Sequence, residues 1–370
     1  MGDEATALVL ESPRRLELRS FPVPDVSDDD ALLRVDACGL CGTDHEQYTG
    51  HLPATFAFVP GHETVGTIER IGSVASRRWG VTEGDRVAVE VFMSCRECDA
   101  CLAGSYQRCR AHGLGDMYGY IATDKAPSLW GGYSTHQYLG PDSIVHKVPD
   151  GLDPVLATVF NPLGAGVRWG VTVPGTKAGD VVAVLGPGIR GLSALVAVKE
   201  AGAAFALVTG AGPNDAPRLE AARGFGADLA VDVRAEDPAA ALKAATGGLA
   251  DVVVDVTAKA PDALAQAISL VRPGGTVVIA GTRGSAETPG FWPDLIVFKE
   301  VRILGALGVD SPAYREALSI LGSRRYPFAD LPRRTAPLSA AAALIEQMAG
   351  EGEGPPPVHA ALVPSDRAPQ

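Results

Sequence analysis

The sequence lacks the features that would assign it to a membrane or to nucleic acid. No apolar stretch reaches the roughly 18 uncharged residues of a membrane-spanning helix, and the longest, from Val181 onward, is interrupted at Gly186, Pro187 and Arg190. No run of about five basic residues occurs, and the 370 residues carry a net charge of −12. Such an acidic chain is not suited to coating nucleic acid or an anionic membrane. We therefore predict a small-molecule partner, with no nucleic-acid and no membrane partner.

The N-terminal segment also lacks the pattern of a secretory signal. It begins MGDEATALVL, which is acidic at its start and has no basic segment followed by an apolar one. The six cysteines are clustered rather than spread, because four of them fall within fifteen residues. In a cytosolic protein, such clustering favours metal binding over disulfides. We therefore expect a cytoplasmic protein.

The length and the change of pattern along the chain predict two domains. A chain of 370 residues is too long for one ordinary core. Residues 1–157 consist of short apolar segments separated by Gly, Pro and Asp, which favours a β-rich domain. Residues 158–307 alternate Val-rich strands with Ala-rich helices. In residues 308–370 this pattern loosens to two short helices, 314–321 and 339–348, and a Pro-rich end, and we expect this tail to return to the first domain. We expect the second domain to be inserted into the first.

The middle domain has the pattern of an α/β fold with a doubly wound parallel sheet. Uninterrupted Val-rich strands that alternate with helices predict a parallel sheet covered on both faces. The expected strands are 181–185, 205–209, 229–232, 252–256, 276–280 and 301–304. The expected helices include 192–201, 218–225 and 261–270, each followed by a stop signal at Gly202, Gly226 or Pro273-Gly274.

A glycine-rich turn follows the first of these strands and opens a helix. Its sequence, GPGIRG (186–191), fits the dinucleotide fingerprint GxGxxG in the required strand–turn–helix context. The helix N-terminus offers free N–H groups and a partial positive charge to the pyrophosphate. The residues expected to bind the cofactor here are Gly186, Gly188, Ile189, Arg190 and Gly191.

The second strand of this domain bears on the choice between NAD and NADP. An acidic residue at its end normally binds the ribose 2′-hydroxyl of NAD. Here the strand ends at Thr209 and Gly210, and the nearest carboxylate is Asp215. Arg218 could meet a 2′-phosphate or could be a solvated helix residue. The cofactor is therefore predicted as NAD(P), with NADP favoured over NAD.

The clustered cysteines predict a structural zinc site in a lobe of about residues 95–109. Four thiolates on one short segment suit a closed tetrahedral site, which leaves no position open for a substrate. These ligands are Cys95, Cys98, Cys101 and Cys109.

A second set of chemical groups precedes this lobe. Cys41 follows an apolar strand, and His62 and Glu63 follow a proline and a glycine. Taken singly, each has an ordinary structural explanation, and we assign Cys38 to the core. Together with the cysteine lobe and the nucleotide fingerprint, they indicate a second metal site.

With these motifs in this order, the chain resembles the zinc-containing medium-chain alcohol and polyol dehydrogenases over nearly its whole length. The resemblance implies a GroES-like catalytic domain and a Rossmann domain, with the active site in the cleft between them. The motifs that carry it, besides the four cysteines, are GLCGTD (39–44), PGHETVG (60–66), GDRVAV (84–89), GGYSTH (131–136), GPGIRG (186–191) and KEVRILGALG (299–308).

The resemblance also implies roles for individual residues. Cys41 and His62 would be ligands of a catalytic zinc, and Glu63 would lie beside the metal. Asp44 would orient a ligand, and Thr43 would carry the hydroxyl through which the substrate proton leaves. The implied reaction is hydride transfer between a zinc-polarised alcohol or carbonyl and the nicotinamide.

Two positions depart from the family pattern. Where relatives place a third zinc ligand, Cys or Glu, this chain has Asn161, whose amide is a weaker ligand. Asn161 could bind weakly, Glu63 could replace it, or the site could hold no zinc; we favour zinc held by Cys41, His62 and Glu63 or a water. Where many relatives have a proton-relaying His, this chain has Glu46, which could pass a proton, bind a polar substrate or be solvated.

The leading hypothesis is a zinc-dependent, NAD(P)-linked dehydrogenase of a secondary alcohol, polyol or sugar, and relatives suggest a homodimer or homotetramer. One alternative is a zinc-independent, NADPH-dependent reductase of activated C=C bonds, which the changes at Asn161 and Glu46 keep open. Another is a non-catalytic cofactor-binding protein. Retention of Cys41, Thr43 and His62 favours the dehydrogenase.

Overall fold

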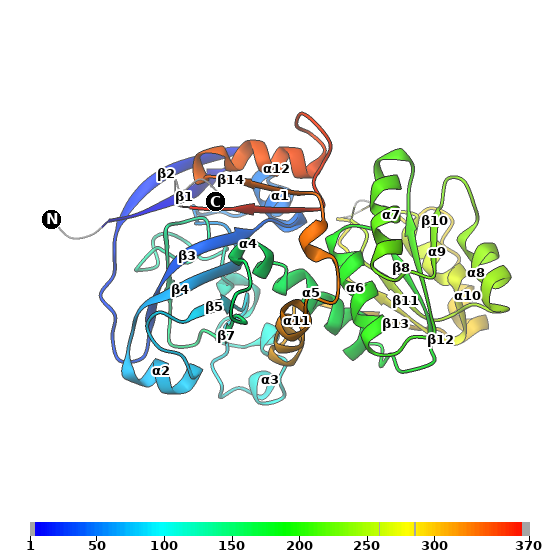
Figure 1. The fold of residues 1–370 in the computed structure, drawn as a ribbon, viewed down its shortest axis with the longest axis horizontal. Coiled ribbons are helices and arrows are strands. Elements are labelled where there is room, and N and C mark those ends of the chain that lie inside the picture. Colours follow the sequence, from blue (N-terminus) through cyan, green and yellow to red (C-terminus); the bar gives the residue numbers. More distant parts are fainter. Residues whose placement is uncertain (1–3, 259, 285, 365–370) are drawn as a thin grey trace. The chain divides into compact units, whose positions relative to one another are not determined.

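The computed structural model describes residues 4–258, 260–284 and 286–364, which form two compact units (Figure 1). Unit 1 contains the residues up to Asn161, Gly308–Arg324 and the chain from Phe328 onward. Unit 2 contains Pro162–Leu307 and Arg325–Pro327. The sequence analysis places the first boundary at 157, slightly earlier than the structure does. Helix α5 (Phe160–Val167) spans the boundary, so the change of sequence pattern precedes the change of unit.

Unit 1 is built on a seven-stranded sheet of order β14-β15-β3-β4-β5-β7, in which β6 also pairs with β3. A separate hairpin joins β1 (Glu4–Ser12) to β2 (Arg15–Pro22). The strands of the sheet are β3 (Ala31–Gly39), β4 (Glu63–Ile71), β5 (Arg86–Val89), β6 (His136–Leu139), β7 (Val145–Lys147), β14 (Arg333–Ala336) and β15 (His359–Leu362).

The pairing of β3 with β4 decides which residues meet at one end of this sheet. The two strands are antiparallel, and Gly39 lies opposite Glu63. Because antiparallel strands run in opposite directions, the chain that leaves β3 meets the chain that enters β4. This register brings Cys41 next to His62, although the two residues are 21 positions apart.

Short helices interrupt the part of unit 1 where the sequence showed little helical periodicity. Helix α1 has only eight residues, begins with glycine and contains few strong helix formers, so its sequence does not predict it. It is fixed at its start by the Asp44 carboxylate, which accepts from the Cys41 N–H. The α-helices of this unit are α1 (Gly42–Thr49), α2 (Ser73–Trp79), α3 (Asp99–Leu102), α4 (Pro154–Ala157), α11 (Ser311–Ser323) and α12 (Ala341–Ala349).

Two apolar clusters account for most of the buried core described in unit 1. One joins the hairpin to helix α12 and strand β15, through residues such as Leu10, Leu344 and Leu362. The other lies among β3, β4 and β5 and includes Leu33 and Ile68. The C-terminal part of the chain therefore completes the core that the N-terminal part begins.

Unit 2 is a six-stranded parallel sheet of order β10-β9-β8-β11-β12-β13, the order of a doubly wound dinucleotide fold. Its strands are β8 (Val181–Leu185), β9 (Phe205–Gly210), β10 (Leu229–Asp232), β11 (Ala250–Asp255), β12 (Val271–Ile279) and β13 (Arg302–Gly305). Its α-helices, apart from α5, are α6 (Ile189–Glu200), α7 (Ala216–Gly224), α8 (Pro238–Thr246), α9 (Ala263–Leu270) and α10 (Asp294–Lys299).

The predicted parallel sheet is confirmed, with one local correction. Consecutive residues Val182–Leu185 are fully buried, so both faces of β8 are covered. Helix α9 ends at Leu270 as expected, but the strand expected from 276 begins earlier, at Val271, so Pro273 lies inside β12. Since proline cannot donate to the ladder, the pairing with β11 skips it and resumes at Thr276.

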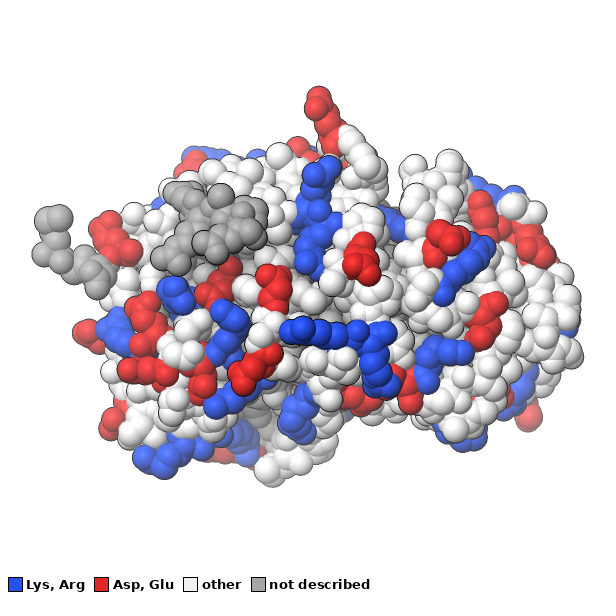
Figure 2. Space-filling view, viewed as in Figure 1, with Lys and Arg blue, Asp and Glu red and all other residues white. Residues whose placement is uncertain are grey.

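The described residues contain no helix that is long and apolar enough to cross a membrane. On the face drawn in Figure 2, acidic and basic side chains are interspersed rather than gathered into a patch of one sign. The net charge of −12 comes from an excess of acidic over basic residues in the whole sequence. On this face it is not gathered into a patch.

A buried histidine connects the C-terminal strand of unit 1 to the chain that leads into α5. The Arg333 Nε–H donates to His359 Nδ1 at 3.1 Å, so the ring proton must lie on Nε2. Nε2 then donates to Thr158 Oγ1 at 2.9 Å. Burial, together with the nearby Arg333 charge, lowers the pKa of His359 to about 3. The ring is therefore neutral in the folded protein.

This buried ring makes folding stability depend on pH. In the unfolded chain His359 titrates near its ordinary pKa of about 6.5, whereas in the folded protein it titrates at about 3. Stability from this group is present above pH 6.5 and is lost as the pH falls, because the unfolded state then binds a proton that the folded state excludes. Between pH 6.5 and pH 5 we expect a loss of about 2 kcal/mol.

The measurement is urea unfolding at pH 7 and pH 5 for the wild type, His359→Gln and, as control, His51→Gln at an exposed position. His359→Gln should be less stable at pH 7 but should lose about 2 kcal/mol less on acidification. Equal losses in all three proteins would contradict the assignment.

Candidate active site and metal sites

Three buried side chains converge at the end of β3 and the start of β4. Cys41 Sγ lies 3.2 Å from His62 Nε2. One ligand atom from each of Cys41, His62 and Glu63 lies within 4.8 Å of the other two. All three residues are less than a tenth exposed. The structure thus brings together three residues that the sequence analysis singled out as metal ligands.

Asp44 lies against two members of this cluster. Its Oδ2 accepts from the Cys41 backbone N–H at 2.8 Å, and its Oδ1 lies 3.8 Å from His62 Nδ1. With His62 Nδ1 facing the carboxylate, Nε2 faces the Cys41 sulfur. At 3.8 Å the Asp44 carboxylate is in ion-pair range of His62 rather than hydrogen-bonded to it, and it lies on the side of the ring from which a carboxylate can orient a metal-binding imidazole.

The donor set fits a zinc ion. Thiolate, imidazole and carboxylate are the groups that zinc prefers, and three protein ligands leave a fourth position for water or substrate. Asn161, the second residue of α5, is buried. The cluster of Cys41, His62 and Glu63 supplies three donors without calling on its amide.

The remaining candidates lie on or near α1. Thr43 and Glu46 are both half-buried on this helix. His45 is directed elsewhere, since its Nε2 lies 2.8 Å from the Glu351 carboxylate beyond α12. His51 is exposed and bonds Thr49 Oγ1 through Nδ1 at 2.8 Å. Thr43, the second residue of α1, carries the hydroxyl that is nearest to Cys41 in the sequence.

Cys38 belongs to the core, as the sequence analysis expected. It is fully buried, and its sulfur lies 3.7 Å from Thr64 Oγ1. Burial raises the pKa of its thiol well above the ordinary value, which keeps it neutral.

The four clustered cysteines also converge. One sulfur atom from each lies within 4.8 Å of all the others, and Cys95 Sγ and Cys101 Sγ are 3.7 Å apart. Backbone N–H groups of Arg110 and Cys101 lower the pKa of the Cys98 thiol to about 6, while burial raises that of Cys101 to about 11. Despite burial, the pKa of the Cys109 thiol is also lowered, by backbone N–H groups, so Cys98 and Cys109 are the sulfurs most readily deprotonated for metal binding. A four-sulfur set of this kind fits a structural zinc site.

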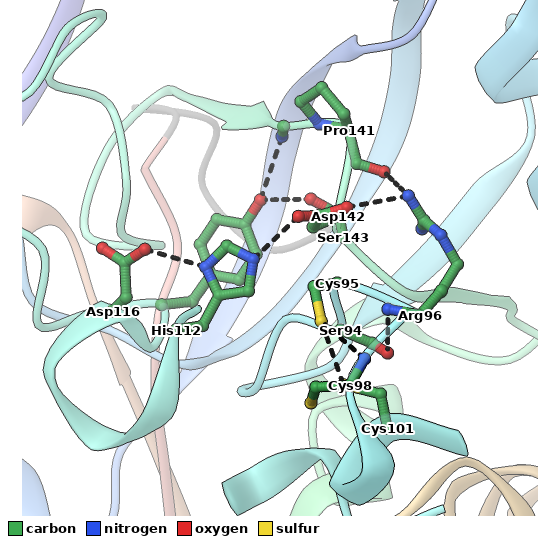
Figure 3. A network of polar contacts seen from close by, with 12 residues as sticks. Ser94, Cys95, Arg96, Cys98, Cys101, His112, Asp116, Pro141, Asp142 and Ser143 are labelled. Carbon is green, nitrogen blue, oxygen red and sulfur yellow. Dashed lines mark hydrogen bonds and ion pairs between the residues drawn. The ribbon is translucent and has the colours of Figure 1, made fainter. Parts of the chain in front are cut away.

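Polar contacts anchor this cysteine lobe to the loop between β6 and β7 (Figure 3). Arg96, which lies between Cys95 and Cys98, donates to Pro141 O at 3.1 Å and to Asp142 Oδ1 at 2.8 Å. His112 Nε2 meets Asp142 Oδ2 at 2.8 Å from the other side. The orientation of the lobe therefore does not depend on the four sulfurs alone.

In unit 2 the glycine fingerprint has the geometry of a phosphate-binding turn. Gly186 has φ +103°, which only glycine adopts without strain, and a Cβ on Gly191 would lie 1.8 Å from Gly186 O. Gly188 precedes α6, so the free N–H groups of this helix face the turn. The helix begins at Ile189, and the Arg190 guanidinium stacks on Trp169 with 5.2 Å to the ring centre.

The residues expected to bear on the choice between NAD and NADP lie at and just beyond the end of β9. Thr209 and Gly210 are buried at the strand end. Asp215 Oδ2 accepts from the Ala211 N–H at 2.9 Å, and its Oδ1 accepts from Arg218 at 3.2 Å. Arg218 is therefore already paired with a carboxylate.

Sequence reasoning missed Arg234 near this strand end. It follows β10, and its guanidinium nitrogen would lie 2.8 Å from a Cβ placed on Gly212. Asp232 Oδ1 accepts from the backbone N–H groups of both Gly212 and Arg234, each at 2.9 Å, which joins the two loops. The position of Arg234 after β10 could have indicated it, because β10 neighbours β9 in a doubly wound sheet. For the choice between NAD and NADP, we considered only the residues after β9.

Comparisons with known proteins bear on this geometry. Residues 27–150 match the alcohol dehydrogenase GroES-like domain, and residues 191–323 match the zinc-binding dehydrogenase domain. A probable alcohol dehydrogenase of Mycobacterium tuberculosis is 65% identical over 364 residues, which are 98% of this chain and 99% of the relative. The chain belongs to the zinc-containing medium-chain alcohol dehydrogenase family. The predicted fold class, a GroES-like domain with a Rossmann domain, is confirmed with it.

More distant members of the family are also similar. Sorbitol dehydrogenase of Bacillus subtilis is 32% identical over 303 residues, 81% of either chain. Among solved structures, an alcohol dehydrogenase from Thermotoga maritima has a TM-score of 0.85 at 25% identity and covers 98% of this chain and 100% of its own. A putative zinc-binding dehydrogenase from Sinorhizobium meliloti, solved bound to NADP, has a TM-score of 0.81 at 27% identity, with coverage of 98% and 100%.

Proposed function

We propose that this protein is a zinc-dependent, NAD(P)-linked dehydrogenase that interconverts an alcohol and a carbonyl. The proposal rests on the buried cluster of Cys41, His62 and Glu63, held by Asp44 in a member of the alcohol dehydrogenase family. The substrate class is a secondary alcohol, polyol or sugar, the class of the sorbitol dehydrogenase to which the chain is similar.

Cys41, His62 and Glu63 would hold the catalytic zinc, and the four lobe cysteines would hold a structural one. The catalytic ion would supply Lewis-acid polarisation of the substrate oxygen. The dinucleotide, with its pyrophosphate at the Gly186–Gly191 turn, would accept or deliver the hydride through its nicotinamide. In unit 1, Asp44 orients the His62 ring and the Cys41 backbone.

Thr43 is assigned the proton step. Its hydroxyl lies two residues after Cys41, at the second position of α1, and it is half-buried. A hydroxyl both accepts and donates a hydrogen bond, so Thr43 Oγ1 can take the proton of a substrate alcohol while it passes its own onward. Glu46, one helical turn further along α1, is half-buried and is the group to which this proton would next move.

NADP is the preferred cofactor in this proposal. The carboxylate nearest the end of β9, Asp215, is occupied by Arg218 and by the Ala211 N–H. Arg234 is exposed and lies against Gly212, where a guanidinium suits a 2′-phosphate.

The homodimer or homotetramer and the cytoplasmic location stay predictions.

The first test concerns the reaction and the proton step. Initial rates with a panel of secondary alcohols, polyols and sugars, followed by nicotinamide absorbance, should show oxidation with kcat reduced about a hundredfold or more in Thr43→Val. Thr43→Ser, which keeps the hydroxyl, should retain most of the rate. Turnover of enones alone would instead identify a C=C reductase, and equal rates in both variants would remove Thr43 from the proton path.

The second test concerns the cofactor. A lost charge-assisted hydrogen bond in Arg234→Ala should raise KM for NADP about tenfold to a hundredfold and leave KM for NAD nearly unchanged. Arg218→Ala is the matched control, because its guanidinium is paired with Asp215. A wild type that prefers NAD, or an equal effect on both cofactors, would contradict the preference.

A further inference from the structure

A buried ion pair lies at the carboxyl end of β11, outside the groups used so far. Asp255 is fully buried, and the Arg283 side chain is 11% exposed. Asp255 Oδ2 accepts from Arg283 Nη2. Its Oδ1 accepts from the Thr257 N–H at 3.0 Å and from the Thr257 hydroxyl at 2.6 Å. Both oxygens of this carboxylate are therefore occupied by the protein.

The pair ties together the chain segments that follow two neighbouring strands. Asp255 ends β11, whereas Arg283 lies beyond β12 and also donates from Nε to Ala260 O at 2.9 Å. The backbone also joins these two segments: Asp255 O accepts from the N–H groups of Ala280 and Gly281 at 2.9 and 3.1 Å. The two segments are thus tied to each other by both side-chain and backbone contacts.

The segment after β11 borders the glycine turn. Thr257 Cγ2 would lie 3.2 Å from a Cβ on Gly186, and the Val256 N–H donates to Leu185 O at 3.2 Å. In the order β9-β8-β11-β12, the strand order reverses between β8 and β11. A doubly wound sheet binds a dinucleotide across the crevice at that reversal, one half on each side. The glycine turn belongs to the β8 half, and the Asp255–Arg283 pair belongs to the other.

We propose that Asp255 and Arg283 are positioning residues that preset the nicotinamide half of the dinucleotide site. This inference rests on the proposed function. Arg283 acts through the protein, because it donates hydrogen bonds to Asp255, Thr257 and Ala260. By fixing the segments after β11 and β12, the pair supplies a preformed backbone surface, so binding does not have to order these segments first.

The test compares the whole cofactor with its adenine half. Dissociation constants for NADPH and for adenosine 2′,5′-bisphosphate are measured by calorimetry on the wild type, Arg283→Met and Arg283→Lys. Arg283→Met should weaken NADPH binding roughly tenfold or more and leave bisphosphate binding within about twofold. Arg283→Lys, which keeps the charge but cannot span Asp255 and Ala260, should give a smaller loss of the same kind and provides the answer if Arg283→Met does not fold.

A matched control comes from the opposite ends of the same strands. Arg272 Nε donates to Asp251 at 2.7 Å there, so Arg272→Met removes an ion pair from β11 and β12 far from the crevice. It should bind both ligands as the wild type does. Equal weakening of both ligands by the Arg283 variants, or no weakening, would overturn the inference. A wild type that binds neither of these ligands nor NADH would instead overturn the proposed function.

Discussion

The antiparallel pairing of β3 with β4 is the constraint on which the candidate active site depends. With Gly39 opposite Glu63, the residues just beyond each strand meet, and Cys41 comes within 3.2 Å of His62. A slip of one residue would turn one strand's side chains to the other face of the sheet and separate the cluster. The first turn of α1 then adds Asp44, which accepts from the Cys41 N–H and lies beside the His62 ring. The metal-binding geometry is thus a consequence of backbone register, completed by one carboxylate.

The two units prepare their sites by different means. Unit 1 gathers side chains that can hold metal ions, at the β3–β4 end and in the cysteine lobe that Arg96 anchors to the β6–β7 loop. Unit 2 offers mainly backbone, namely a glycine turn and a helix start beside two segments joined by Asp255 and Arg283. Metal ions need fixed side-chain donors, whereas a dinucleotide is recognised by N–H groups and close backbone approach. In both units, the β3–β4 site and the glycine turn lie at the ends of strands that are packed into the core.

Features encoded by neighbouring residues could be predicted from the sequence, and features that depend on distant pairing could not. The glycine turn and the four cysteines are local patterns, and both appear in the structure as expected. Helix α1 escaped prediction because its residues are poor helix formers held by a cap. Arg234 and the Asp255–Arg283 pair become visible only when adjacent parallel strands bring separate loops together. The exchange of a zinc ligand for Asn161 was visible in sequence and pointed to Glu63 as one possible replacement, but only the folded chain places Glu63 together with Cys41 and His62.

The most direct test of the two-metal arrangement is elemental analysis of zinc in the purified protein and in Cys41→Ser. We expect two zinc ions per wild-type chain, one from each cluster, and one in Cys41→Ser, because the four-cysteine lobe keeps its own. A wild type that holds a single zinc, unchanged in Cys41→Ser, would contradict a metal at Cys41, His62 and Glu63 and would remove the basis for zinc-assisted alcohol oxidation.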